Sequence, residues 1–198
     1  SEEEHRMNTT EIFEARRSIR RFTQTPIPRQ VLASMLEAAR LAPTAANAQP
    51  LQFVAVSRPS LCAAIFPHLR WAGHLPDGSA SPTTDTRPTA YVAILVDKQI
   101  RENADTDAGA AAMALMLCAQ AHDVASCWLG AIARDALLSV LGLDANRFHL
   151  HTVLALGYPA QASRTVDCID GRTAYYLESP DHLCVPKRRK EDITHLLV

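Results

Sequence analysis

The stretch DAGAAAMALMLCAQAH at residues 107–122, with SCWLG following at 126–130, decides the fold. Its first part is apolar on nearly every side of a helix, which is typical of a helix buried in the core. Small side chains in this helix allow close approach by another helix or by a partner subunit: Gly109, Ala110, Ala111, Ala112 and Ala114. The second part predicts a short strand that ends at Gly130. A buried helix followed by a strand indicates a core built from helices and a sheet.

Other apolar runs predict the remaining elements. Strands are expected at 53–56, 90–96, 126–129 and 150–156, with a further candidate at 173–177. Helices are expected at about 11–17, from Pro28 to 42, at 59–68 and at 134–141. A capping box at 8–11 opens the first helix. Because strands and helices mix without a regular βαβ rhythm, we predict an α+β fold whose central sheet of about five strands is wrapped by helices.

Composition limits the class of protein. The chain has 198 residues, of which 47% are hydrophobic, so one domain over 1–198 is expected. The formal net charge is −1, and no overall field attracts nucleic acid or an anionic membrane. The longest apolar run, 108–119, is too short to span a membrane. Five cysteines without a CxxC pair favour a reducing compartment, and the cytoplasm is the expected location.

Two segments lie outside this core pattern. Residues 1–10 are expected to form an N-terminal extension, and the acidic, polar start at 1–5 does not resemble a signal peptide. Residues 73–89 are rich in Gly, Pro, Ser, Thr and Asp, and they form the only long loop. A loop of this length in a compact domain is often a lid or a binding segment.

Positive charge is concentrated at the two ends of the chain. RRSIRR at 16–21 and KRRK at 187–190 hold 8 of the 20 Lys and Arg residues. Two or three such groups, helped by a hydroxyl such as that of Ser18, are the usual way to hold a phosphate. Arg16 and Arg20 share a face if the first helix continues, and Lys187 and Arg189 point to the same side of an extended segment. The alternative is that both clusters are solvated surface charge.

The loop APTAANAQP at 42–50 connects a helix to a strand and is bounded by prolines. Asn47 and Gln49 each offer a donor and an acceptor, which match the alternating edge of a flavin pyrimidine ring. An ordinary helix-to-strand connection is the alternative.

The end of the strand at 126–129 is a third candidate. Gly130 allows the backbone to approach a flat ligand closely, and a backbone N–H there could face flavin N5. Cys127 is expected to be a core cysteine, because no basic residue or His stands beside it. The eight histidines show no metal-binding spacing, and the chain has no GxGxxG, Walker A or GxSxG motif.

Five segments together resemble the nitroreductase family of FMN-dependent oxidoreductases. They are RRSIRRF at 16–22, APTAANAQP at 42–50, the helix and strand over 107–130, LALGYP at 154–159 and KRR at 187–189. The resemblance covers roughly residues 11–191. It implies a nitroreductase-like fold with a mixed, mainly antiparallel sheet, in an intertwined homodimer that binds FMN at the subunit interface. Leu51 and Ala46 depart from the family pattern, which has Trp and Gly or Ser there in many members.

Residue roles follow from the resemblance by position. The phosphate and ribityl chain would be bound by Arg16, Arg17, Ser18, Arg20, Lys187 and Arg189. The other subunit would contribute Pro43, Thr44, Ala45 and Asn47, with Gln49 as a weaker candidate. The backbone of Leu129 and Gly130 would face N5. No catalytic side chain and no metal ligand is assigned.

The implied activity is that of an NAD(P)H oxidoreductase. NADH or NADPH reduces the flavin, and a nitroaromatic, quinone or similar small acceptor then takes its place in a ping-pong cycle. Two alternatives stay open. One is a relative with a different flavin reaction, such as reductive dehalogenation or breakdown of the flavin, and the other is a non-enzymatic FMN-binding module.

Overall fold

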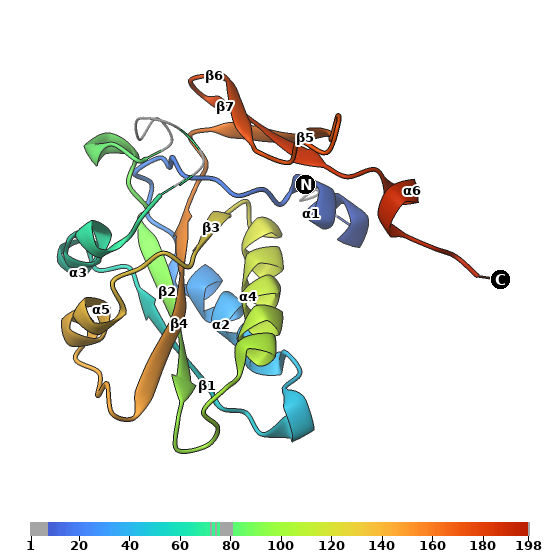
Figure 1. Cartoon of the computed structure of the whole chain (residues 1–198). Coiled ribbons are helices and arrows are strands. Elements are labelled where there is room, and N and C mark those ends of the chain that lie inside the picture. Colours follow the sequence, from blue (N-terminus) through green and yellow to red (C-terminus); the bar gives the residue numbers. More distant parts are fainter. Residues whose placement is uncertain (1–7, 72, 74, 76–80, 198) are drawn as a thin grey trace, which may run out of the picture.

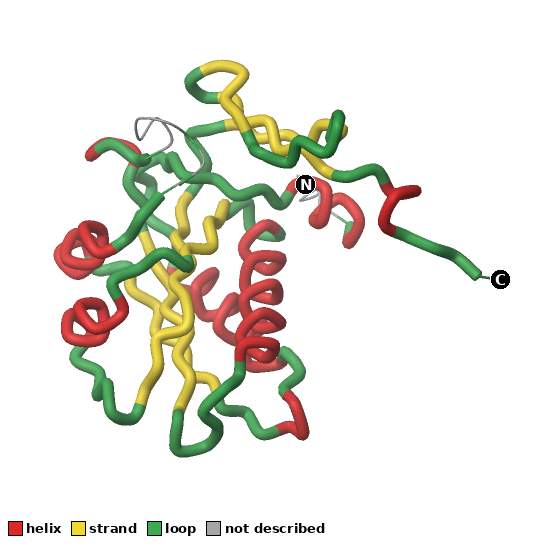
Figure 2. Tube along the Cα trace, in the orientation of Figure 1, coloured by secondary structure: helices red, strands yellow, loops and turns green. Residues whose placement is uncertain are grey.

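The computed structural model describes residues 8–71, 73, 75 and 81–197 (Figure 1). Four strands form the central sheet, and all their neighbouring pairs are antiparallel. In order across the sheet they are β1 (Leu51–Val56), β2 (Ala90–Asp97), β4 (Phe148–Gly157) and β3 (Ala125–Leu129). Figure 2 shows the strands between two groups of helices. This arrangement confirms the predicted α+β class.

The sheet is buried on both faces because its strands carry nearly continuous apolar runs. All eight residues of β2 are buried. Alternate side chains enter two separate core clusters, so that Val92 and Ile94 face one way while Tyr91 and Ala93 face the other. The first cluster lies under α2 (Arg29–Leu41) and α4 (Asp105–Gln120), and the second lies under α3 (Pro59–Ile65) and α5 (Arg134–Leu141).

Sequence signals account for where these helices begin and end. The capping box of Asn8 and Glu11 is present and opens α1 (Thr9–Ala15). Helix α5 ends at Gly142, whose φ of 68° is left-handed, as a glycine after a helix allows. Helix α4 has no narrow apolar stripe, in agreement with the prediction of a buried helix.

The strand expected at 173–177 begins later than predicted, as β6 (Tyr176–Ser179), and belongs to a second sheet. The strands of this sheet, in order, are β5 (Ala162–Asp167), β7 (His182–Lys187) and β6. Strand β7 pairs in parallel with β5 and antiparallel with β6. The central sheet therefore has four described strands instead of about five. The fifth candidate joins this separate sheet by pairing with β7, whose Leu183 and Cys184 are buried, whereas β5 has no buried residue.

Short elements complete the described chain. They are the 3-10 turns η1 (Ala45–Asn47), η2 (Phe66–His68) and η4 (Thr84–Thr86), and the C-terminal helix α6 (Lys190–Ile193). The predicted extension lies outside the described residues up to position 7, and so do positions 74 and 76–80 of the predicted lid loop. In the part that is described, none of the helices combines the length and the apolar character needed to cross a membrane.

Phe22 fixes the N-terminal segment to the end of the central sheet. It is fully buried, and its backbone forms an isolated bridge with Pro159. A Cβ built at Gly157 would lie 2.8 Å from the Phe22 Cβ. Glycine at 157 is therefore needed so that the Phe22 ring can pack directly on the backbone of β4.

Candidate functional site

The basic segment near the N-terminus is extended, because the helix predicted at about 11–17 ends earlier and does not continue through the segment. Helix α1 ends at Ala15, and Arg16 already has extended backbone angles, with φ −63° and ψ 114°. On an extended segment, alternate residues share one side. Arg16, Ser18 and Arg20 therefore share one side because they alternate along an extended segment, and not because they lie on one face of a helix. Ile19, between them, turns into the core.

Backbone contacts hold this segment against the sheet. The Ile19 N–H donates to the carbonyl oxygen of Ser126 at 3.0 Å, next to a parallel bridge between Ser18 and Ser126. The Arg20 N–H donates to Oε1 of Gln161 at 3.2 Å. Gln161 is itself buried. The arginine side chains therefore extend from a backbone that is fixed at the start of β3.

Both ends of the chain contribute to one cavity. Its volume is about 150 Å³. The lining residues are Arg16, Arg17, Ser18, Arg20, Tyr175, Leu183, Val185 and Lys187. The structure thus brings together the N-terminal basic cluster and the lysine at the end of β7, as expected for a single anion site.

The cavity has many more donors than acceptors. In the described residues, Nε and Nη1 of Arg20 and Nε of Arg17 are buried and have no hydrogen-bond partner. The Arg20 guanidinium lies over the Tyr175 ring, 4.9 Å from its centre. Burial lowers the pKa of Arg16, and burial followed by the charge of Arg16 lowers the pKa of Arg17. Half-buried arginines with unused donors fit an anion with several acceptor oxygens, such as a phosphate.

Arg189 is not brought to this cavity. Strand β7 ends at Lys187, and Arg189 precedes α6, where its Nε lies 3.4 Å from Oδ2 of Asp192. It lines a different hollow together with Asp167 and Asp170. Lys187 and Arg189 were expected to point to the same side of one extended segment. Because β7 ends at Lys187, Arg189 lies outside the strand and the two side chains separate.

The proline-bounded loop lies at the other end of α4. The Ala45 N–H donates to Oδ1 of Asp107, in the first turn of α4, at 2.9 Å. The basic segment adjoins the opposite end, where Arg17 and Gln120 line a common hollow. The 16 residues of α4 span about 24 Å. Within one chain, the loop and the basic cavity are therefore separated by most of this helix.

The loop has an unusual backbone that its contacts hold in place. Ala46, Asn47 and Gln49 have φ values of 53°, 52° and 52°, which non-glycine residues rarely adopt. The Gln49 N–H donates to Oγ1 of Thr44 at 3.1 Å, and Asp107 holds Ala45. A simple helix-to-strand connection does not require three nearby residues with such backbone angles. Backbone strain of this kind is common at binding sites.

We predict that Asp107→Ala releases this loop. Asp107 is 4% exposed, and its Oδ1 is the acceptor for the Ala45 N–H. Loss of a hydrogen bond to a charged group, worth about 1.5–3 kcal/mol, should speed hydrogen exchange at the Ala45 amide by about tenfold or more. Asp107→Asn keeps an acceptor oxygen and should restore protection. Asp105→Ala, in the same helical turn, is the control, and unchanged Ala45 exchange in Asp107→Ala would contradict the role.

The end of β3 has an accessible backbone. Leu129 is buried, and its carbonyl oxygen accepts the hydroxyl of Thr152 at 2.7 Å. Gly130 is exposed, and a Cβ built on it meets nothing within 4 Å. Cys127 is buried, and burial raises its thiol pKa. These features suit a core cysteine followed by a backbone position that a flat ligand can approach.

Sequence reasoning missed three residues that shape the site. Tyr175 stacks on Arg20, Gln161 positions the Arg20 backbone, and Asp107 holds the proline-bounded loop. Tyr175 and Gln161 act through contacts that are distant in sequence, and no local pattern marks them. The sequence did contain a signal for Asp107, because a carboxylate in the first turn of an otherwise apolar, buried helix needs a polar partner.

Comparisons with known proteins point to one family. The model of the nitroreductase family matches residues 13–158. A protein of Archaeoglobus fulgidus, provisionally named an NADH dehydrogenase/NAD(P)H nitroreductase, is 30% identical over 148 residues, which cover 73% of this chain and 81% of that protein.

Solved structures agree in fold. A provisionally assigned nitroreductase of Desulfovibrio desulfuricans, in complex with FMN, is 29% identical with a TM-score of 0.64, over 78% of this chain and 88% of that one. A nitroreductase family protein of Clostridium difficile 630 is 20% identical with a TM-score of 0.65, over 78% and 86% of the two chains. The second likeness concerns the fold alone.

Proposed function

Because this chain belongs to the nitroreductase family, we propose that it binds FMN and works as an NAD(P)H-dependent oxidoreductase. The observation that carries this proposal is the basic cavity, which is lined by residues of 16–20 and of 175–187. Its unused arginine donors match the oxygens of a phosphate monoester. The FMN in the complex of the Desulfovibrio desulfuricans protein supports the same choice of ligand.

In this proposal the phosphate is held from both ends of the chain. Its oxygens accept hydrogen bonds from groups that line the cavity: Arg16, Arg17, Ser18, Arg20 and Lys187. Arg189 would have to leave Asp192 to reach the same group. When bound, FMN supplies the redox chemistry, with NADH or NADPH as donor and a nitroaromatic, quinone or similar small molecule as acceptor.

The residues of the chain itself would bind and orient the flavin. The backbone of Leu129 and Gly130 is proposed to face flavin N5, because Gly130 leaves the end of β3 open. A backbone donor at this position would favour negative charge on the ring. The pyrimidine edge would meet the proline-bounded loop, with Pro43, Thr44, Ala45, Asn47 and more weakly Gln49 as the contributing positions. No side chain is assigned as nucleophile or general acid.

We propose that this loop comes from a second copy of the chain. The loop lies at one end of α4 and the basic cavity adjoins the other end. A two-fold axis across α4 would place the partner's loop beside this chain's cavity. The half-buried outer face of α4 suits such a contact, because it carries no charged side chain: Gly109, Ala110, Met113, Ala114, Leu117 and Cys118.

The C-terminal tail supports an intertwined dimer. Ile193, Leu196 and Leu197 are exposed, the last at 95%. Figure 1 shows α6 and the residues after it projecting away from the rest of the chain. Apolar side chains on a projecting segment suit burial against a partner. We also propose that the chain forms one FMN-binding domain over 1–198, in which the loop 73–89 is a lid.

The five cysteines are all unpaired, at positions 62, 118, 127, 168 and 184. Free thiols are typical of a reducing compartment, and this supports the proposed cytoplasmic location.

Anaerobic reduction tests the proposed activity. Adding NADH or NADPH to the FMN-loaded protein without oxygen should bleach the yellow colour, because hydride transfer removes the oxidised flavin. A nitroaromatic or quinone should then restore the colour without further nucleotide. Retained FMN that neither nucleotide bleaches would contradict the oxidoreductase and favour a non-enzymatic binding module.

A further inference from the structure

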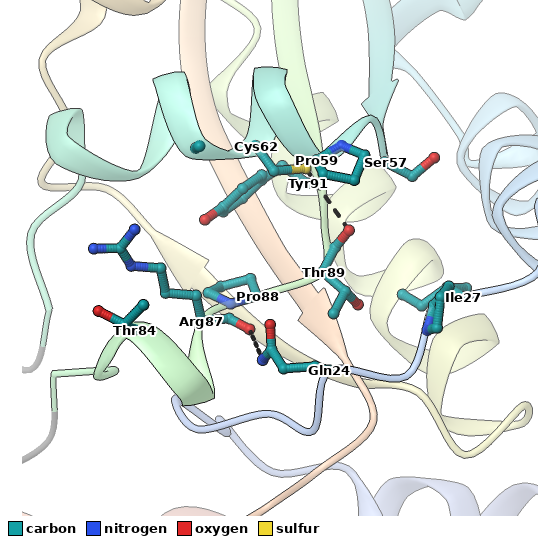
Figure 3. A pocket seen from close by; sticks show the side chains of 12 residues that line it. Gln24, Ile27, Ser57, Pro59, Cys62, Thr84, Arg87, Pro88, Thr89 and Tyr91 are labelled. Carbon is teal, nitrogen blue, oxygen red and sulfur yellow. Dashed lines mark hydrogen bonds between the residues drawn. The ribbon is translucent and has the colours of Figure 1, made fainter.

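A second cavity lies near the edge of the central sheet where β1 is the outermost strand and β2 is its neighbour (Figure 3). Its volume is about 280 Å³. The start of α3, the start of β2 and the segment before α2 form its walls. It shares no lining residue with the basic cavity, which adjoins β3 at the opposite edge of the sheet. Thr84, Arg87, Pro88 and Thr89 belong to the loop 73–89 that is proposed as a lid, but they line this cavity and not the basic one. The residues proposed to hold FMN therefore do not account for this cavity.

Tyr91 places a buried hydroxyl in the wall of this cavity. The residue is 1% exposed, and its hydroxyl has no hydrogen-bond partner in the described part of the chain. Burial above all raises the phenol pKa, so the group is protonated at neutral pH and able to donate. A buried hydroxyl without a partner is costly and indicates that something is missing from its surroundings.

Two further polar atoms of lining residues are also unused. Within the described residues, Nε of Arg87 and Oγ1 of Thr89 are buried without a partner. The rest of Arg87 is well held, because its guanidinium lies 4.1 Å from the centre of the Phe66 ring and its carbonyl oxygen accepts from Gln24 at 3.0 Å. In Figure 3 the Arg87 guanidinium and the Tyr91 hydroxyl lie on the same side of the cavity.

The remaining walls are mainly apolar and carry no negative charge, and their polar side chains are the neutral Gln24, Ser57 and Thr84. The apolar residues include Pro26, Ile27, Pro59, Ala63 and Pro88. The Cys62 sulfur lies 3.7 Å from the carbonyl oxygens of both Val56 and Thr89, so its single S–H can donate to either of them, and burial raises the thiol pKa to about 11. This thiol therefore stays neutral at neutral pH and does not repel an anion.

We propose that this cavity binds a small carboxylic acid, as its carboxylate, with an apolar body. The Arg87 guanidinium and the Tyr91 hydroxyl would donate to the carboxylate oxygens. The proline, isoleucine and alanine side chains would surround the body of the ligand. A phosphate fits less well, because the cavity offers one cation among mainly apolar groups, in contrast to the basic cavity.

Thermal unfolding and calorimetry of the FMN-loaded protein test this proposal, with cyclohexanecarboxylate as the probe. Its non-planar ring is a poor partner for stacking on a flavin. The probe should raise the unfolding temperature and leave the visible flavin spectrum unchanged, because the cavity is separate from the proposed flavin site. Inorganic phosphate at the same concentration should have little effect on the wild-type protein beyond that of ionic strength.

Two substitutions separate ligand binding from structure. Arg87→Gln should weaken probe binding by about 10- to 100-fold, and Tyr91→Phe by about threefold to tenfold. Without the probe, Tyr91→Phe should unfold at the same or a higher temperature, since it removes a hydroxyl that has no partner. Exposed Arg58→Gln and Tyr176→Phe are the matched controls and should bind the probe as the wild type does.

Several outcomes would overturn the proposal. They are no binding of the probe, binding that survives both Arg87→Gln and Tyr91→Phe, and binding that shifts the flavin spectrum. Equal stabilisation by inorganic phosphate would also overturn it. If Arg87→Gln does not fold, Tyr91→Phe alone tests the proposal. This variant should be at least as stable as the wild type without the probe and should bind the probe more weakly.

Discussion

Arg20→Ala is expected to weaken FMN binding by about 10- to 100-fold. Arg20 brings two buried donors, Nε and Nη1, to the basic cavity, and they have no partner in the described residues. A hydrogen bond to a charged group contributes about 1.5–3 kcal/mol, and each 1.4 kcal/mol is about tenfold in affinity. Because Tyr175 and the Gln161 contact already hold Arg20 in position, its donors are ordered before the phosphate arrives.

Titration of the flavin-free protein with FMN, followed by quenching of flavin fluorescence, measures this effect. Arg188→Ala is the matched control. It removes the same charge next to Lys187, but Arg188 is exposed and does not line the cavity. The control should bind FMN within about twofold of the wild type. Equal affinity of Arg20→Ala and the wild type would remove Arg20 from the site.

Phe22→Ala should lower the free energy of unfolding by about 3–5 kcal/mol. The Phe22 side chain is fully buried, and its ring packs on Gly157 at a distance that leaves no room for a Cβ. Loss of the ring leaves a hole between the N-terminal segment and β4, which a rigid strand cannot fill. The basic segment precedes Phe22 directly, so FMN affinity should fall as well.

Urea unfolding at one fixed protein concentration measures this loss, since the proposed dimer would make stability depend on concentration. Phe13→Ala is the control, because the Phe13 side chain is 48% exposed on α1. Its cost should stay within about 1 kcal/mol. A Phe22→Ala protein as stable as Phe13→Ala would show that the N-terminal segment is not fixed to the sheet through this ring.

Long apolar patterns made most of the central fold predictable. Strand β2 and helices α4 and α5 were expected within two residues of their observed bounds, because their runs are long or end at a clear signal such as Gly142. Strands β5 and β7 were missed. Strand β5 has no buried residue, and it is held by backbone pairing with a strand distant in sequence. Such pairing leaves no hydrophobic period to detect.

The basic cavity was predictable in composition but not in geometry. The concentration of charge at 16–21 and 187–190 indicated one anion site, and the cavity contains residues of both clusters. Arg16 and Arg20 were expected to share a helical face if the first helix continued, but α1 ends at Ala15 and the segment is extended. Element boundaries are set by tertiary contacts, here the bond from Ile19 to Ser126, and a local pattern does not contain them.

The binding of FMN compared with riboflavin tests the central claim most directly, because riboflavin has the same ring and ribityl chain without the phosphate. If the cavity of Arg16, Arg17, Ser18, Arg20 and Lys187 holds the phosphate, FMN should bind at least about 100-fold more tightly, which corresponds to two charge-assisted hydrogen bonds. Equal affinities for the two flavins, or no binding of either, would contradict it.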